Sequence, residues 1–177
     1  MSLRLEMMQV ARLAPRLLGE SGALVRDFLL RQQNSDGGFR DRAGKSDLYY
    51  TVFGLDSLLA LETSGIVPAT ASGKVFARAG EFVRFQGAGD SLDFVHLCCL
   101  ARGWAAVEDQ AKTDAAPPGL RAELARKIGE FRAADGGFNP VRGSATGTAY
   151  GAFLALGGYQ DSKTELPEPL RLVQSLK

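Results

Sequence analysis

The residue types that most often perform chemistry are sparse in this chain, but two of them stand close together. His96, the only histidine, precedes Cys99 by three residues, so on a helix both side chains would share one face. Imidazole and thiolate are ligands of Zn²⁺, and a single ion can be held by both. The alternative is that Cys99 and its neighbour Cys98 are ordinary core residues. The pattern leaves both interpretations open.

Two charged residues interrupt apolar runs that are predicted to be helical. Asp56 lies within the run from Leu48 to Leu61, and Arg102 lies at the equivalent depth of a later run. The two side chains are expected to form either a structural ion pair or a pair that orients a substrate. If the chain is an enzyme, Asp56 is the candidate acid or charge-orienting group.

Aromatic residues gather in the same run as Asp56. At about 100° per residue the run has two faces. The aliphatic face is expected to pack on a neighbouring helix and carries Leu48, Val52, Leu55 and Leu59. The other face carries Tyr49, Phe53, Asp56, Ser57 and Ala60, with Tyr50 at its edge. Aromatic side chains with few polar groups suit an apolar ligand pocket, and aromatic faces stabilise a carbocation. The alternative is helix packing or a solvated surface.

The predicted helices are organised around a repeated turn. Asp36-Gly37-Gly38-Phe39 recurs as Asp135-Gly136-Gly137-Phe138, each time after an amphipathic run and before an apolar one. Paired glycines reach positive φ at little cost, the Asp carboxylate accepts hydrogen bonds from nearby backbone N–H groups, and the Phe is expected to enter the core. We therefore interpret the turn as scaffold and not as an active site.

The hydrophobic pattern predicts helices and no strands. The predicted helices cover residues 3–18 (with a kink or restart at Pro15), 24–33, 48–62 (after an N-cap at Ser46 or Asp47) and 120–132, and others start near Asp93, Ala149 and Leu170. Residues 63–73 and 108–118 are expected to be connections. In a second, degenerate unit the turn is shortened to Gly87–Asp90. By repeat register, its ligand-facing residues are Val95, His96, Cys99 and Arg102, and those of the next unit are Thr146, Tyr150 and Phe153.

Composition limits the classes of function. The 177 residues suffice for one domain, and 45% apolar with 23% charged residues is typical of a globular protein. A net charge of +1 gives no basic surface for nucleic acid or an anionic membrane. The two adjacent cysteines provide no disulfide framework, which favours a reducing compartment. Charged residues near the N-terminus argue against a signal peptide, and no apolar stretch approaches the ~20 residues of a membrane span. We expect a cytoplasmic protein.

The repeat resembles a known superfamily. Phe28-Leu29, then Gln33, then Gly37 and Phe39 are similar to the aromatic-Leu-x-x-x-Gln-x-x-x-Gly-x-Trp motif of triterpene cyclases. The Asp-Gly-Gly-Phe turns resemble those of protein prenyltransferase β subunits. Both belong to the prenyltransferase and squalene-oxidase repeat superfamily. The resemblance implies an all-α fold, an α/α toroid with inner and outer rings of helices around a central cavity, and an isoprenoid substrate.

The resemblance also sets the expected domain organisation. The whole chain, residues 1–177, is expected to be one α/α-toroid domain of about three and a half repeats, at roughly 22–64, 74–108, 118–160 and 166–177. Superfamily members usually have five to seven repeats. We therefore expect either a piece of a longer chain or an incomplete ring that a second copy of the chain would close.

Two catalytic motifs of the superfamily are broken here. Prenyltransferase β subunits hold a zinc ion with an Asp-x-Cys pair and a distant His, whereas Asp93 is followed two residues later by Val95 and no histidine exists besides His96. Class II terpene cyclases use an Asp-x-Asp-Asp acid, whereas the nearest string here is Asp90-Ser91-Leu92-Asp93. Asp93 is better placed to cap the following helix.

Two functions remain as hypotheses. The first is an isoprenoid enzyme, a relative of prenyltransferases or terpene cyclases, with Asp56 as its catalytic group. Its cavity would be lined by Tyr49, Tyr50, Phe53, His96, Cys99, Arg102 and Tyr150. The second is a non-catalytic repeat module that binds a lipid or a protein on its concave face.

Overall fold

The chain is mainly helical. The structure is a computed structural model, and it describes residues 3–11, 13, 17–63 and 65–177. Helices account for 61% of it, beside one two-stranded sheet, which confirms the all-α class. The chain divides into two compact units, one formed by residues 3–87 and 103–115 and the other by 88–102 and 116–177.

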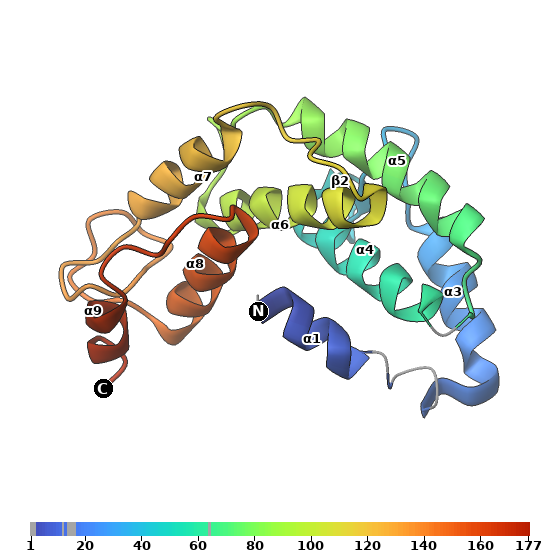
Figure 1. Cartoon of the computed structure of the whole chain (residues 1–177), viewed down its shortest axis with the longest axis horizontal. Helices are drawn as coiled ribbons and strands as arrows, with labels where there is room; N and C mark the ends of the chain where they lie inside the picture. Colours follow the sequence, from blue (N-terminus) through green and yellow to red (C-terminus); the bar gives the residue numbers. More distant parts are fainter. Residues whose placement is uncertain (1–2, 12, 14–16, 64) are drawn as a thin grey trace. The chain divides into compact units, whose positions relative to one another are not determined.

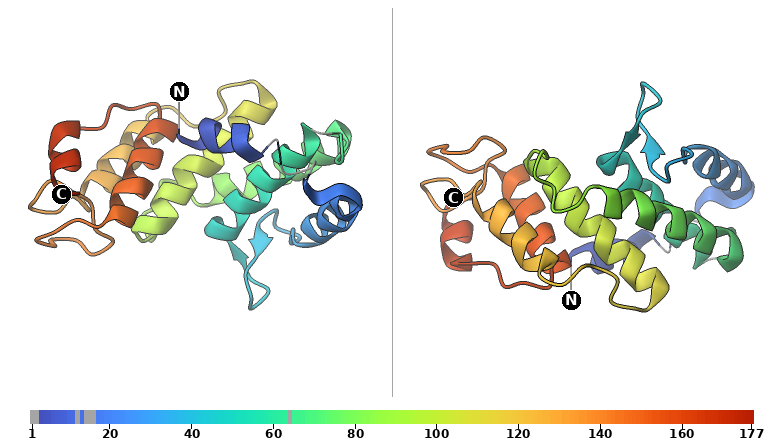
Figure 2. Two further views of the ribbon diagram at one scale, coloured as in Figure 1. Left: turned by 90° about the horizontal axis from the view of Figure 1, so that it is seen from below. Right: turned by 90° about the horizontal axis from the view of Figure 1, so that it is seen from above.

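The first unit is built around a central helix, α4. Its elements are α1 (Leu3–Ala11), η1 (Gly19–Ser21), α3 (Gly22–Arg31), β1 (Phe39–Arg40), β2 (Ser46–Asp47), α4 (Leu48–Glu62), α5 (Ala69–Phe85) and the second half of α6 (Phe94–Ala111). Helices α1, α3 and α5 each pack against α4 (Figure 1). The β1–β2 pair projects beside the N-terminal end of α4 (Figure 2).

The second unit repeats part of this arrangement. It holds the first half of α6, then α7 (Leu120–Gly129), α8 (Ala149–Asp161) and α9 (Pro169–Gln174), with α7 packed against α8. In each unit a Gly-rich turn joins a shorter helix to the next one: α3 to α4, and α7 to α8.

Local sequence signals explain the start of α4 and of α8. The Asp47 carboxylate accepts a hydrogen bond from the Tyr50 N–H at 3.0 Å, and the Thr148 hydroxyl accepts one from the Gly151 N–H at 2.9 Å. These N-caps satisfy N–H groups that have no partner within the helix. The predicted span 48–62 and its cap at Asp47 are confirmed.

Other predicted boundaries were wrong. The helix predicted over 3–18 ends at Ala11, and Pro15 lies outside the described residues. Helix α5 begins inside the connection predicted over 63–73. Helix α6 continues to Ala111, into the linker predicted over 108–118. The reason is that Glu108 is buried, and its carboxylate accepts a hydrogen bond from the Ala115 N–H at 3.1 Å, which fixes the chain after the helix.

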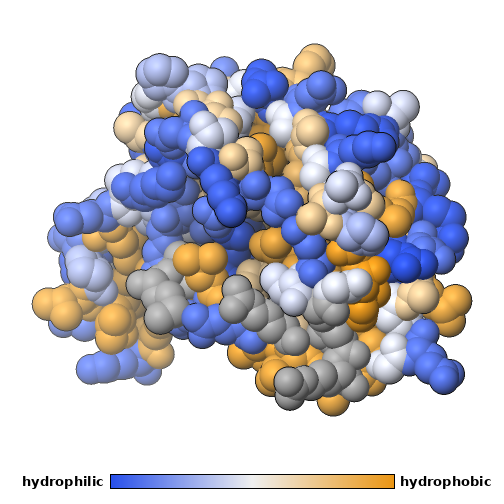
Figure 3. All heavy atoms as spheres, turned by 45° about the vertical axis from the view of Figure 1, so that its right-hand side comes forward, coloured by the Kyte–Doolittle hydropathy of each residue, from blue (hydrophilic) through white to orange (hydrophobic). Residues whose placement is uncertain are grey.

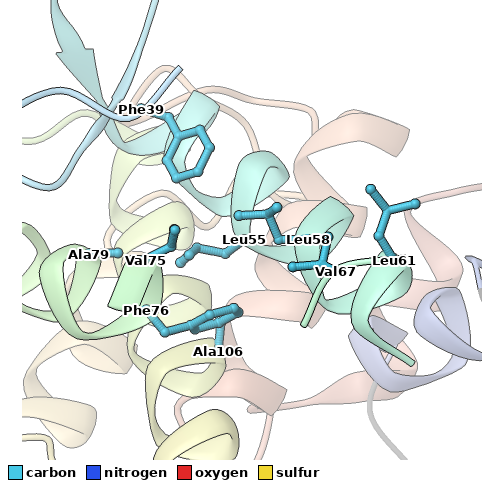
Figure 4. Packing of buried hydrophobic residues seen from close by; sticks show 9 residues of the cluster. All are labelled: Phe39, Leu55, Leu58, Leu61, Val67, Val75, Phe76, Ala79 and Ala106. Carbon is cyan, nitrogen blue, oxygen red and sulfur yellow. The ribbon is translucent and has the colours of Figure 1, made fainter. Parts of the chain in front are cut away.

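The core of the first unit joins the turn to three helices. Phe39 lies between α4 and α5, above Leu55 and Leu58, while Phe76 of α5 reaches Ala106 of α6 (Figure 4). Gly54 allows this arrangement, because a Cβ atom there would overlap the Phe39 ring. In the second unit Phe138 is fully buried, with Phe94 and Tyr159 around it at ring-centroid distances of 6.5 and 6.2 Å.

The two complete turns have the same internal geometry. Gly37 and Gly136 have φ of 92° and 93°. The Asp36 carboxylate accepts from the Gly38 N–H at 3.1 Å and from the Ser46 hydroxyl at 2.6 Å. The equivalent carboxylate of Asp135 accepts from two backbone N–H groups, those of Gly137 and Gly147, both at 2.8 Å. The expected roles of the Asp, Gly and Phe residues are confirmed. The prediction of no strands was wrong, because the same turn pairs β1 with β2, antiparallel, with Phe39 opposite Asp47.

A cation from the second helix after each turn donates a hydrogen bond to the backbone of that turn. Arg78 of α5 donates to the Asn34 carbonyl at 2.6 Å, and Arg171 of α9 donates to the Ala134 carbonyl at 3.1 Å. In the degenerate unit Lys127 of α7 donates to the Ala88 carbonyl at 2.7 Å and also pairs with Asp90. In the first unit Gln33 also connects the turn to α5, because its side-chain amide donates to the carbonyls of Gly37 and Val75.

These contacts predict a large difference between two glycine variants. A Cβ atom at Gly37 would overlap the carbonyl oxygen of Arg78, whereas at Gly44, where φ is 82°, nothing lies within 4 Å. Gly44→Ala is expected to cost about 1–2 kcal/mol from backbone strain alone. Gly37→Ala should cost about 2 kcal/mol more because the turn must also move away from α5. Urea unfolding measures both values, and equal losses would contradict the docking of this turn on α5.

Candidate functional site

The aromatic residues of α4 form a continuous surface on the first unit. Tyr49 and Phe53 are 38% and 47% exposed, and Tyr50 is 39% exposed. The rings of Tyr49 and Phe53 lie 4.8 Å apart between centroids, and those of Tyr49 and Tyr50 lie 5.9 Å apart. We call Tyr49, Tyr50 and Phe53 the aromatic face. Large aromatic side chains left accessible in a well-packed unit are candidates for ligand contact.

The aromatic face is turned outward because the aliphatic side of α4 packs into the core. Leu48, Val52 and Leu55 are buried, as their shared helical face predicts, and Leu59 is half-buried. Ala60 is also buried, although its position in the helical pattern placed it on the aromatic side. The aromatic face therefore covers the first two turns of α4 and does not extend to the end of the helix.

Asp56 lies one turn beyond Phe53, where it meets an arginine from far away in the sequence. The Arg4 guanidinium of α1 lies with Nη1 3.8 Å from Asp56 Oδ1, and it also pairs with the Asp109 carboxylate of α6. Arg4 is 3% exposed, Asp56 is largely buried and Asp109 is 48% exposed. Two carboxylates from two helices thus surround one buried guanidinium.

Sequence reasoning missed Arg4 and Asp109. The sequence predicts a helix over 3–18 but does not show that Arg4 is buried, and nothing in it links position 4 to position 109. Only the structure shows that Arg4 and Met8, a turn apart on α1, are both buried. Arg102 belongs to the second unit, where it is half-buried. The pair predicted between Asp56 and Arg102 stays a prediction.

In the second unit, Asp93 and His96 form a pair at the start of α6. Asp93 Oδ1 accepts from the His96 backbone N–H at 2.9 Å and lies 2.8 Å from His96 Nδ1. The expected capping role of Asp93 is confirmed. Burial raises the pKa of Asp93, but the hydrogen bonds from the His96 backbone and ring and the Val95 backbone outweigh it, so that the pKa lies below its ordinary value.

The remaining predicted residues of the second unit differ in accessibility. Cys99 and Cys98 are buried, with no disulfide between them, and burial raises the pKa of the Cys98 thiol. Tyr150 and Phe153 are exposed on α8, as is Thr146 before it. Within this unit the exposed predicted residues are thus Thr146, Tyr150 and Phe153, whereas Val95, His96 and Arg102 are half-buried.

The donors near His96 do not fit the zinc centre of the prenyltransferases. The Asp93 carboxylate is engaged with the His96 backbone and ring, and the Cys99 side chain is buried. Among the described residues no group of three or more His, Cys, Asp or Glu side chains converges in a way that could hold a metal ion. We therefore derive no chemistry from a metal here.

Comparison with models of protein families, with characterised proteins and with solved structures finds no match for this chain. Over the part of the chain that the structure describes, no helix is both long enough and apolar enough to cross a membrane. Apolar residues nevertheless reach the surface at several places, as one face of the molecule shows (Figure 3). Outside α4 and α8 the most exposed large ones are Phe85, Leu17, Leu170 and Leu24.

The Asp93 pair predicts a specific change in acid stability. Because the pKa of Asp93 is lowered by folding, its charged form stabilises the fold above about pH 4 and that contribution is lost as the pH falls through the folded pKa. In Asp93→Asn the cap acceptor is kept, since Asn is an equally good N-cap. The free energy of unfolding of the variant should therefore fall less steeply below about pH 4 than that of the wild type. Urea titrations at several pH values measure this, and identical slopes would show that the Asp93 charge contributes nothing.

Proposed function

We propose that this chain handles an isoprenoid or similar apolar substrate on the aromatic face of α4, as a relative of prenyltransferases and terpene cyclases. The observation that carries the proposal is the aromatic face itself: three adjacent rings that remain accessible on a helix whose other side is buried. The α/α toroid and its closure by a second copy, both implied by the resemblance, are part of the same proposal.

The chemistry of the aromatic face suits a prenyl chain. Tyr and Phe rings offer large apolar area with few rotatable bonds, and burying it against a hydrocarbon contributes about 25 cal/mol per Å². Ring faces also attract positive charge, which is how a carbocation that forms on an isoprenoid would be stabilised. Asp56, one turn further along α4, is the proposed acid or charge-orienting group. In the second unit, the residues that the resemblance proposes for substrate contact are His96, Cys99, Arg102 and Tyr150.

A second candidate function is a non-catalytic repeat module that binds a lipid or a protein. The observation that favours it is the state of Asp56, which faces the Arg4 guanidinium and not an open surface. A face that binds a prenyl chain while the Asp56 carboxylate stays covered by Arg4 would carry a ligand without transforming it.

Binding of isoprenoid probes tests both candidates. Calorimetry with farnesol and farnesyl diphosphate is expected to show micromolar binding, about −8 kcal/mol. The double variant Tyr49→Ser/Phe53→Ser should weaken it at least tenfold, because two rings are lost from the contact. The control is Phe85→Ser, which removes an aromatic side chain that is 89% exposed elsewhere in the same unit. Absence of binding, or an equal loss in the control, would contradict the proposal.

Turnover separates the enzyme from the module. Incubation with farnesyl and geranylgeranyl diphosphates, followed by mass spectrometry, should give products that Asp56→Asn no longer forms although it still binds farnesol. Binding without any product in the wild type would favour the non-catalytic module.

A further inference from the structure

Helix α1 is attached to its unit through a contact that includes a buried charged side chain, that of Arg4. Of its described residues, Arg4 and Met8 are buried, and they lie one turn apart on the same side. Leu5, Met7 and Val10, on the other sides, are exposed. The helix has nine residues, which is too short to be stable in isolation. Its conformation therefore depends on its contact with the rest of the unit, in which Arg4 and Met8 are the buried side chains.

The charged part of this contact is costly as well as specific. The Arg4 guanidinium is 3% exposed and therefore nearly fully desolvated. The free-energy cost of this desolvation offsets much of its attraction to Asp56 and Asp109. One partner, Asp109, is 48% exposed, so this half of the cluster is screened by solvent. The net free energy of docking α1 is thus a small difference between the attraction of Arg4 to its carboxylates and the cost of desolvating it. A modest competing interaction is enough to displace the helix.

The position of the contact gives it a consequence for ligand binding. Arg4 covers Asp56, which is one turn from Phe53 and two from Tyr49 on the same side of α4. We propose that α1 is a displaceable cover: when it is docked, Arg4 closes the Asp56 end of the aromatic face, and when it leaves, a longer stretch of α4 becomes accessible. The ligand part of this inference rests on the proposed function, whereas the opening of α1 does not.

Hydrogen exchange of the full chain, followed by mass spectrometry, tests the opening. In Arg4→Ala, exchange of residues 3–11 is expected to become at least tenfold faster, with exchange in α3, α4 and α5 unchanged. Asp109→Asn should act in the same direction, since it weakens the contact from the other side and leaves Asp56 intact. Arg42→Ala, which removes an exposed arginine of the same unit, is the control and should change nothing.

Farnesol binding to the same variants tests the cover. The affinity of Arg4→Ala and Asp109→Asn should be at least fivefold higher than that of the wild type, and farnesol should speed exchange of residues 3–11 in the wild type. If farnesol binds all proteins equally, α1 does not cover the ligand site and the inference is overturned. If exchange rises throughout the first unit in Arg4→Ala, α1 is an integral part of the fold and the inference is likewise overturned. If farnesol binds none of them while α1 alone exchanges faster, the opening stands and the proposed function fails.

Discussion

The docking of each turn on the second helix after it is the constraint on which the rest of the chain depends. A turn between two helices presents carbonyl oxygens that helix hydrogen bonds do not satisfy, and here a cation from the second helix after the turn donates to one of them: Arg78, Lys127 or Arg171. A residue larger than glycine at position 37 would keep α5 away. Successive helices can therefore stack only when the turn has a glycine with positive φ at the contact and the facing helix has a cation that reaches the turn.

The turn also decides which side of the next helix is buried. Phe39 extends from the turn across α4 and fixes Gly54 and Leu55 toward the core, which leaves Tyr49 and Phe53 pointing outward. The aromatic face is thus a consequence of the same packing that stabilises the unit. In the second unit the backbone carbonyl of Phe138 lies against Gly151 of α8, and Tyr150 beside it remains exposed. The equivalent helices carry different polar residues, so the scaffold repeats while its chemistry does not.

The sequence was informative wherever one local interaction decides the structure. The Asp47 cap, the span of α4 and the Asp-Gly-Gly-Phe turn depend on residues a few positions apart, and all were predicted. The failures involve distant partners. Arg4 pairs with Asp109, 105 positions away in the sequence. Glu108 is a charged residue that is nevertheless buried, and its carboxylate accepts a hydrogen bond from the Ala115 N–H. The β1–β2 pair forms because the turn brings Phe39 opposite Asp47, and two-residue strands leave no alternating pattern to detect.

The candidate site therefore consists of one part that the helical pattern predicts, the aromatic face, and one that only the tertiary structure supplies, the Arg4 contact with Asp56. The most direct measurement of where an isoprenoid lies is photolabelling of the full chain with a diazirine analogue of farnesol, followed by peptide mapping. The account predicts label on α4, at Tyr49, Tyr50 or Phe53. Label confined to exposed apolar residues of other helices, such as Leu24 and Phe28 of α3, would contradict it.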